Sequence, residues 1–182
     1  AGTSFTDAVP TKVILTSNLN PSQTGDNLTF TALVQRNGGN AQQVNNVSGQ
    51  LQFFVNEVAV GDGLPGANNS NSKSFTISNL PAGTNVIKAV FTGTNNTSTG
   101  NNGFENSNSS ISQVVNKRTA TLDFNNLTYT YDGTAKSATV TTNPVGLTGV
   151  GITYNGSTAA PTTAGTYEVV ATLTNANYEA AS

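Results

Sequence analysis

The apolar residues of this chain occur in short runs, and each run is bounded by asparagine, glycine or proline. Between Leu28 and Val34 apolar and polar residues alternate, so every second side chain faces the same side of an extended chain. The runs are rich in Val, Ile, Phe, Tyr and Thr, which strands favour. No segment has the periodicity of an amphipathic helix over a useful length. The sequence therefore predicts an all-β fold.

About seven such runs lie in the first part of the chain, and turn residues separate them. The predicted strands are Lys12–Thr16, Leu28–Val34, Leu51–Val55, Val58–Val60, Phe75–Ile77, Val86–Phe91 and Ile111–Val115. The dipeptide Asn56-Glu57 joins two of them and predicts a hairpin, and Asn20-Pro21 predicts a turn. Short strands separated in this way are typical of a β-sandwich.

A second set of strands begins at Thr119. Its predicted members are Ala120–Phe124, Tyr129–Tyr131, Ala138–Thr142, Val150–Tyr154 and Thr166–Thr174. Asn155-Gly156 is a strong hairpin signal, because both positions of that turn need a positive φ. We therefore predict two tandem domains, residues 1–117 and 118–182, with a boundary near the basic pair Lys117-Arg118.

The second predicted domain is small. Domains of about 65 residues bury only ~60% of the surface of their unfolded chain and are marginally stable. The sequence also stops soon after the last predicted strand. We expect this domain to lack its last strand, and the chain to be a piece of something longer.

The composition is compatible with a folded chain of low charge. Asn, Thr, Ser and Gly number 26, 29, 16 and 18 of the 182 residues, and charged residues make up 9%, against roughly 25% in an ordinary globular protein. Polar tracts of this kind are often disordered. Disorder predicts no periodicity, however, and the alternation of apolar residues therefore favours a folded chain.

Several classes of function are excluded by what the sequence lacks. It has no His and no Cys, which excludes zinc fingers, thiol redox pairs and His-based catalytic sites. Its net charge is −2, and it has no basic cluster to bind nucleic acid. No stretch approaches about 18 consecutive apolar residues, so we expect no membrane insertion. We expect a monomer that is not an enzyme and that uses no cofactor.

Residues 11–116 resemble the bacterial Ig-like repeat domains of large secreted and surface proteins. The segments that carry the resemblance are Leu19–Asp26, Leu28–Val34, Ser48–Phe53, Leu80–Gly93 and Ser107–Val115. They cover nearly the whole first domain in the order usual for the family. The resemblance implies an Ig-like β-sandwich.

Residues 118–182 resemble the "mostly beta, glycine-rich" (MBG) repeat of bacterial adhesin-like proteins. The matching segments are Leu127–Lys136, Thr142–Pro144, Ile152–Gly156, Pro161–Tyr167 and Asn177-Tyr178. The resemblance implies a structural repeat without catalytic residues. It also implies core or corner positions for the five tyrosines, which are Tyr129, Tyr131, Tyr154, Tyr167 and Tyr178.

The nine carboxylates are the candidate acids, bases and hard metal ligands. Asp132 and Asp123 suggest a glycosidase pair, but an Asp-Gly turn favours a bond from the Asp132 side chain to its own backbone. Calcium sites generally need several carboxylates together. Asp62 and Glu105 are isolated in their loops, so we predict no metal site.

The polar loop Gly93–Ser110 contains one aromatic residue, Phe104. The interpretation that we favour is that its ring folds back onto the sandwich. The alternative is a contact surface for a glycan or a host protein, formed by Phe104 with Asn102, Glu105 and Asn106.

These observations favour a non-catalytic spacer or stalk of a bacterial extracellular or cell-surface protein. Its partners would then be the neighbouring repeat domains of the same longer chain. Two alternatives stay open. One is a binding module for a glycan or a host protein, and the other is an accessory part of a secreted polysaccharide-degrading enzyme.

Overall fold

The computed structural model describes residues 8–37, 49–65, 72–93 and 103–181. Its regular elements are all β-strands, so within these ranges the predicted all-β class is confirmed. The chain divides into two compact units, Ala1–Val115 and Asn116–Ser182, which we call the N-terminal and the C-terminal unit. In the described part of the chain no helix is long and apolar enough to cross a membrane.

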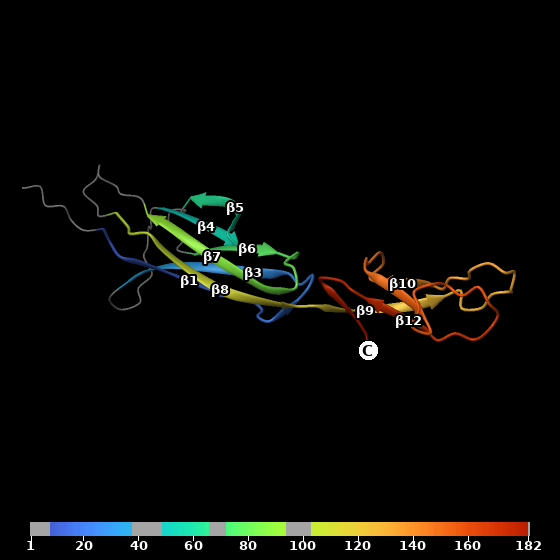
Figure 1. The fold of residues 1–182 in the computed structure, drawn as a ribbon. Helices are drawn as coiled ribbons and strands as arrows, with labels where there is room; N and C mark the ends of the chain where they lie inside the picture. The colour runs from blue at the N-terminus through green and yellow to red at the C-terminus, as the bar shows by residue number, and fades with distance from the viewer. Residues whose placement is uncertain (1–7, 38–48, 66–71, 94–102, 182) are drawn as a thin grey trace, which may run out of the picture. The chain divides into compact units, whose positions relative to one another are not determined.

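The N-terminal unit contains two sheets (Figure 1). The first has the order β1 (Thr11–Ser17), β3 (Leu28–Arg36), β6 (Ser72–Ile77), and the second has the order β2 (Ser22–Gln23), β8 (Ser107–Asn116), β7 (Gly83–Gly93), β4 (Gly49–Val55), β5 (Val58–Pro65). Both sheets contribute side chains to one core, so the unit is a β-sandwich. Each of the seven predicted strands lies within an observed strand, and β2 is an addition.

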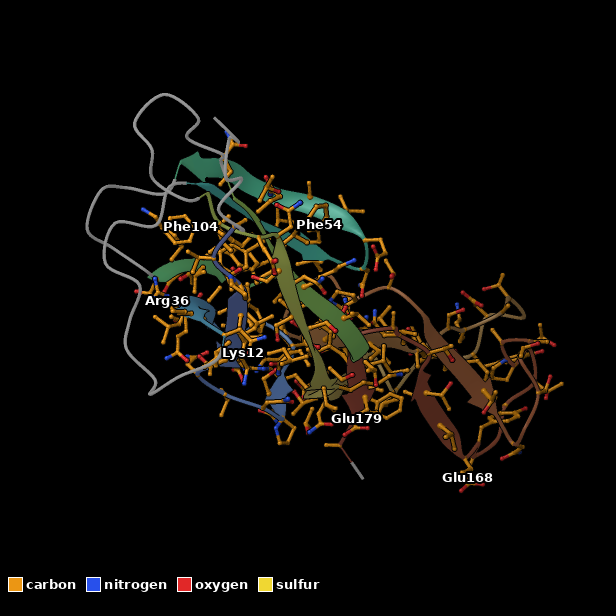
Figure 2. All side chains as sticks on the ribbon, turned by 90° about the vertical axis from the view of Figure 1, so that its left-hand side faces the viewer. Lys12, Arg36, Phe54, Phe104, Glu168 and Glu179 are labelled. Atoms are coloured by element: carbon orange, nitrogen blue, oxygen red, sulfur yellow. The ribbon has the colours of Figure 1, made fainter. Side chains whose placement is uncertain are left out.

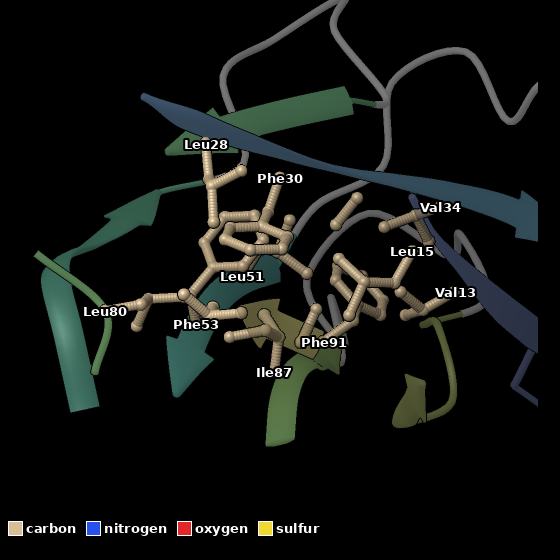
Figure 3. Packing of buried hydrophobic residues seen from close by; sticks show 13 residues of the cluster. Val13, Leu15, Leu28, Phe30, Val34, Leu51, Phe53, Leu80, Ile87 and Phe91 are labelled. Carbon is tan, nitrogen blue, oxygen red and sulfur yellow. The ribbon is translucent and has the colours of Figure 1, made fainter. Parts of the chain in front are cut away.

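The core of the sandwich follows from the alternation in the sequence. Along β3 the exposed fraction is 1% for Leu28 and 0% for Phe30, while the residues between them are half-buried. The first sheet contributes Leu28 and Phe30 to the core, and the second contributes Ile87 and Phe91 (Figure 3). The ring of Phe75 lies 5.5 Å from that of Phe30 and 5.3 Å from that of Phe53, so it links the two sheets.

The predicted hairpin at Asn56-Glu57 is confirmed. The φ angles of Asn56 and Glu57 are 49° and 67°, as a two-residue turn between twisted strands requires. The Asn56 side chain accepts a bond from the Val86 amide and donates one to Asn85, both at 2.9 Å. The hairpin is thereby fixed to β7.

The C-terminal unit contains two smaller sheets. One has the order β10 (Thr139–Asn143), β9 (Arg118–Asn125), β13 (Tyr178–Ala180), and the other pairs β11 (Val150–Tyr154) with β12 (Val169–Leu173). The predicted strand Tyr129–Tyr131 is wrong, because residues 126–138 form no strand and have no ladder partner. Strand β13, which pairs in parallel with β9, was not predicted because three residues are too few to show a period.

The turn at Asn155-Gly156 has positive φ angles of 47° and 81°, as predicted. Tyr154 and Ser157 exchange backbone hydrogen bonds of 2.7 and 2.9 Å across it. The chain then leaves the ladder, and the strand that pairs with β11 is β12, with Tyr154 opposite Val169. The turn therefore does not connect β11 directly to its partner strand, because the residues between Ser157 and Val169 separate the turn from β12.

The buried part of the C-terminal unit is small. Its buried side chains in the described residues are Ala120, Ala138, Thr142 and Tyr154. The Tyr154 hydroxyl accepts a hydrogen bond of 2.8 Å from the Ala138 amide, which fixes β11 to the start of β10. Thr142 accepts one from the Leu147 amide and donates one to the Pro144 carbonyl, which closes the turn after β10.

Candidate functional site

Phe104 packs against the hydrophobic core of the N-terminal unit and is half-buried (Figure 2). It forms a β-bridge with Val9, and the Glu105 amide donates a 3.0 Å bond to the Val9 carbonyl. This agrees with the interpretation that the ring folds back onto the sandwich. A Cβ added at Gly93 would lie 2.0 Å from the Phe104 carbonyl oxygen, so a glycine is needed there.

The other predicted contact residues are placed as follows. The Glu105 carbonyl accepts a 2.8 Å bond from the Thr11 hydroxyl, and the Glu105 side chain is exposed. The Asn106 side chain accepts a 3.0 Å bond from the Gly93 amide, which closes the base of the loop. Asn102 lies outside the described residues. These contacts tie residues 104–106 to the sandwich, and a contact role for the loop stays a prediction.

The carboxylates are not gathered into a metal or catalytic cluster within the described ranges, where no group of three His, Cys, Asp or Glu side chains is found. The side chain of Asp62 is not among those described. The turn interpretation of Asp132 is confirmed: one carboxylate oxygen accepts bonds from the amide and hydroxyl of Thr134, at 2.9 and 2.6 Å. The other lies 2.6 Å from the Lys136 ammonium.

These bonds hold the pKa of the Asp132 carboxyl far below its usual range. The Lys136 ammonium is the largest cause, followed by the hydroxyl and then the amide of Thr134. Asp132 therefore stays ionised at neutral pH and has no proton to give as a general acid.

A pocket of about 310 Å³ lies in the C-terminal unit. Its walls come from two segments without regular structure, residues 126–138 and 161–167, together with Tyr154 of β11 and Val169 of β12. Among the lining side chains are four tyrosines, which are Tyr129, Tyr131, Tyr154 and Tyr167. Aromatic and polar groups thus converge around a concave surface here, as they do in ligand sites.

The expectation of core or corner positions for the tyrosines is wrong for two of them. Tyr131 is 66% exposed and Tyr129 is 45% exposed, while Tyr154 is only 7% exposed. The physical reason is the missing strand at residues 126–138. Without a partner strand the segment cannot direct alternate side chains into a core, so Tyr129 and Tyr131 both reach solvent. Tyr167 and Tyr178 are half-buried.

Hydrogen bonds fix both walls of the pocket. On one side, the Tyr129 hydroxyl donates to the Ser137 carbonyl, and Lys136 bonds to Asp132 and Thr134. On the other side, the Tyr167 hydroxyl lies 2.7 Å from that of Thr163. The Lys136 amide donates a 3.0 Å bond to the Pro161 carbonyl, which joins the two walls. The pocket is therefore formed without a ligand.

Comparison with known protein families finds one match, which lies in the C-terminal unit. Residues 120–182 match a family described as "MBG domain". MBG domains are typical of bacterial surface and repeat proteins and are of a non-catalytic type. No curated protein and no solved structure matches the chain. The resemblance of residues 118–182 to the MBG repeat is thus supported, and the Ig-like resemblance of residues 11–116 stays a prediction.

Proposed function

We propose that this chain is a non-catalytic spacer of a bacterial extracellular or cell-surface protein of the adhesin-like kind. The observation that carries the proposal is the match of residues 120–182 to the MBG domain, a repeat of bacterial surface proteins. The division into two compact β-units supports it, because each domain added to a chain adds length to the protein. The partners in this proposal are the neighbouring domains of the same longer chain.

The strands of the N-terminal unit are suited to resist extension. Strand β1 is paired with β3 along its whole length, from Thr11 to Ser17. Strand β8 is paired with β7 from Ser107 to Val115. Since these are the first and last strands of the sandwich, pulling the chain apart has to break one of these ladders.

The polar side chains support a passive role as well. The polar side chains buried in the N-terminal unit are bonded within it, as Gln113 is to Ser22 and Asn85 is to Asn56. The Asp132 carboxylate is bonded to Thr134 and Lys136. These bonds give the side chains a structural role within the fold.

A length-matched replacement tests the proposal. In the parent protein, these residues are exchanged for two unrelated β-sandwich domains of equal total length, and adhesion of intact cells is measured. Retained adhesion is expected, since a spacer contributes length. Deletion of the residues without replacement is the control and is expected to reduce adhesion. If the replacement abolishes adhesion as fully as the deletion, the chain has a specific role and the spacer proposal is wrong.

A further inference from the structure

We propose that the pocket of the C-terminal unit binds one neutral sugar residue of a glycan. The proposal concerns a site other than the Phe104 loop and goes beyond the spacer role. It is carried by the exposed tyrosines, by the size of the pocket and by the chemistry of its walls.

The exposed aromatic side chains are the first step of the argument. Tyr131 is 66% exposed, Leu127 is 60% exposed and Tyr129 is 45% exposed, and all three line the same pocket. Large apolar side chains that are exposed side by side mark binding sites, whereas single ones are ordinary. A tyrosine ring has a negative face, which attracts the weakly positive C–H groups on the flat side of a sugar ring.

The dimensions of the pocket are the second step. At about 310 Å³ it is at the small end of the range of about 300–1,000 Å³ for ligand sites. A volume of this size accommodates one small ring and not a folded partner. The two walls are fixed by their own hydrogen bonds, including that of the Lys136 amide to the Pro161 carbonyl, so little ordering is required on binding.

The polar groups of the walls are the third step. Thr130, Thr162 and Thr166 line the pocket and carry hydroxyl groups, each of which both donates and accepts hydrogen bonds. Sugar hydroxyls have the same dual character. The charged residue of the lining, Lys136, lies 2.6 Å from the Asp132 carboxylate, so its charge is compensated. The chemistry of the pocket therefore favours an uncharged ligand with many hydroxyls.

A peptide is the competing ligand, and the backbone argues against it. Extended peptides commonly bind by adding a strand to a sheet edge. The two wall segments, residues 126–138 and 161–167, form no strand. The pocket therefore offers side chains rather than a ladder of backbone groups.

Titration of the 182-residue chain, followed by amide NMR spectra, tests the proposal. The probes are glucose, galactose, mannose and N-acetylglucosamine with their disaccharides, added to about 20 mM so that a Kd of about 1 mM is nearly saturated. Sialic acid serves as a charged comparison, and a tyrosine-containing tetrapeptide represents a peptide ligand. At least one neutral sugar is expected to give saturable shifts at residues 127–136 and 161–167.

Variants assign those shifts to the pocket. Tyr131→Ala is expected to lower the affinity at least tenfold, while Tyr131→Phe retains the ring and most of the affinity. Leu127→Ala is a second test in case Tyr131→Ala alters the fold, which its amide spectrum would reveal. Val145→Ala is the matched control, because Val145 is 92% exposed and does not line the pocket.

Three results would overturn the proposal. One is the absence of saturable shifts with every neutral sugar of the panel. Another is a shift pattern that Tyr131→Ala and Leu127→Ala leave unchanged. The third is binding of the tetrapeptide or of sialic acid alone, which would assign the pocket to a different ligand class.

Discussion

Replacement of Gln113 by leucine tests how the N-terminal unit is held together. This side chain is polar but has an exposed fraction of 0%. Its amide nitrogen donates to the Leu19 carbonyl at 2.9 Å and to the Ser22 hydroxyl at 3.1 Å, and its oxygen accepts from Ser17 at 2.8 Å. Leucine has a similar size and makes none of these bonds. The substitution therefore removes the bonds that the Gln113 side chain makes to β1 and to the segment around β2, while those of Asn20 to β8 remain.

The expected magnitude follows from the number and burial of these bonds. A typical hydrogen bond contributes about 0.5–1.5 kcal/mol net, and a buried group left without a partner costs about 1–3 kcal/mol. Ser22 is 3% exposed and keeps only its 3.3 Å bond to the Val114 carbonyl, whereas the groups of Ser17 and Leu19 lie nearer the surface. We expect the free energy of unfolding to fall by about 2–4 kcal/mol. At about 4–8 °C per kcal/mol for a domain of about 100 residues, the Tm falls by about 8–32 °C.

The positions of the tyrosines provide the assay. All five, from Tyr129 to Tyr178, belong to the C-terminal unit, and the chain has no Trp. Tyrosine fluorescence therefore follows the unfolding of the C-terminal unit, while far-UV circular dichroism follows the strands of both units. In a urea titration of Gln113→Leu, the part of the dichroism change that does not coincide with the fluorescence transition is expected at lower urea, and the fluorescence transition is expected to keep its midpoint.

A loss below about 1 kcal/mol would refute the reasoning, because the buried side chain would then contribute no more than one ordinary hydrogen bond. Val114→Thr is the matched control on the same strand. Val114 is 39% exposed and faces the other side of β8, so the change is expected to stay within about 0.5 kcal/mol. If the control loses as much as Gln113→Leu, the effect belongs to the strand and not to the buried amide.

Three further predictions concern the core, a glycine and a carboxylate. Phe75→Ala is expected to cost about 3–5 kcal/mol in the dichroism transition, since its ring contacts those of Phe30 and Phe53; a cost under about 1 kcal/mol would contradict this packing. Gly149→Ala is expected to lower the fluorescence midpoint, because Gly149 has a φ of 89° and an added Cβ would lie 1.9 Å from the Thr174 carbonyl oxygen; an unchanged midpoint would contradict the geometry. The lowered pKa of Asp132 predicts that the ¹³C signal of its carboxyl group titrates with a midpoint below 3.8, and a midpoint at or above 3.8 would refute the bonds to Lys136 and Thr134. The contribution of the ionised Asp132 to stability is complete above pH 3.8 and is lost only as the pH falls through the lowered pKa.

The strands of the N-terminal unit were predictable because alternation reports burial directly. Along β3 the apolar residues of the sequence are the buried residues of the structure. The burial of Gln113 was missed, although it follows the same rule. In β8, Gln113 lies on the same face as Ile111 and Val115. The alternation of the strand therefore predicts that its side chain points inward, whereas its polarity predicts an exposed side chain.

The pocket was not predictable from the same signals. Tyr129 and Tyr131 alternate in the sequence as core residues do, yet they are exposed because no strand pairs with that segment. Alternation is a property of one segment, whereas burial also requires a second segment that packs against it. The sequence pattern does not show which segment that is. The pocket further depends on the contact of Lys136 with Pro161, two residues far apart in the sequence and both outside regular structure.

Hydrogen bonds between uncharged side chains join exposed positions of neighbouring strands in this chain of low charge. Between β3 and β6, hydroxyl groups pair across the strands, Thr29 with Thr76 at 3.0 Å and Thr31 with Ser74 at 2.7 Å. Opposite charges at such exposed cross-strand positions also attract each other, but salt screens their attraction. Hydroxyl pairs carry no net charge and do not titrate in the ordinary pH range, so their contribution is nearly independent of ionic strength and pH. The pairing of β3 with β6 is therefore expected to depend little on the ionic strength and pH of the medium.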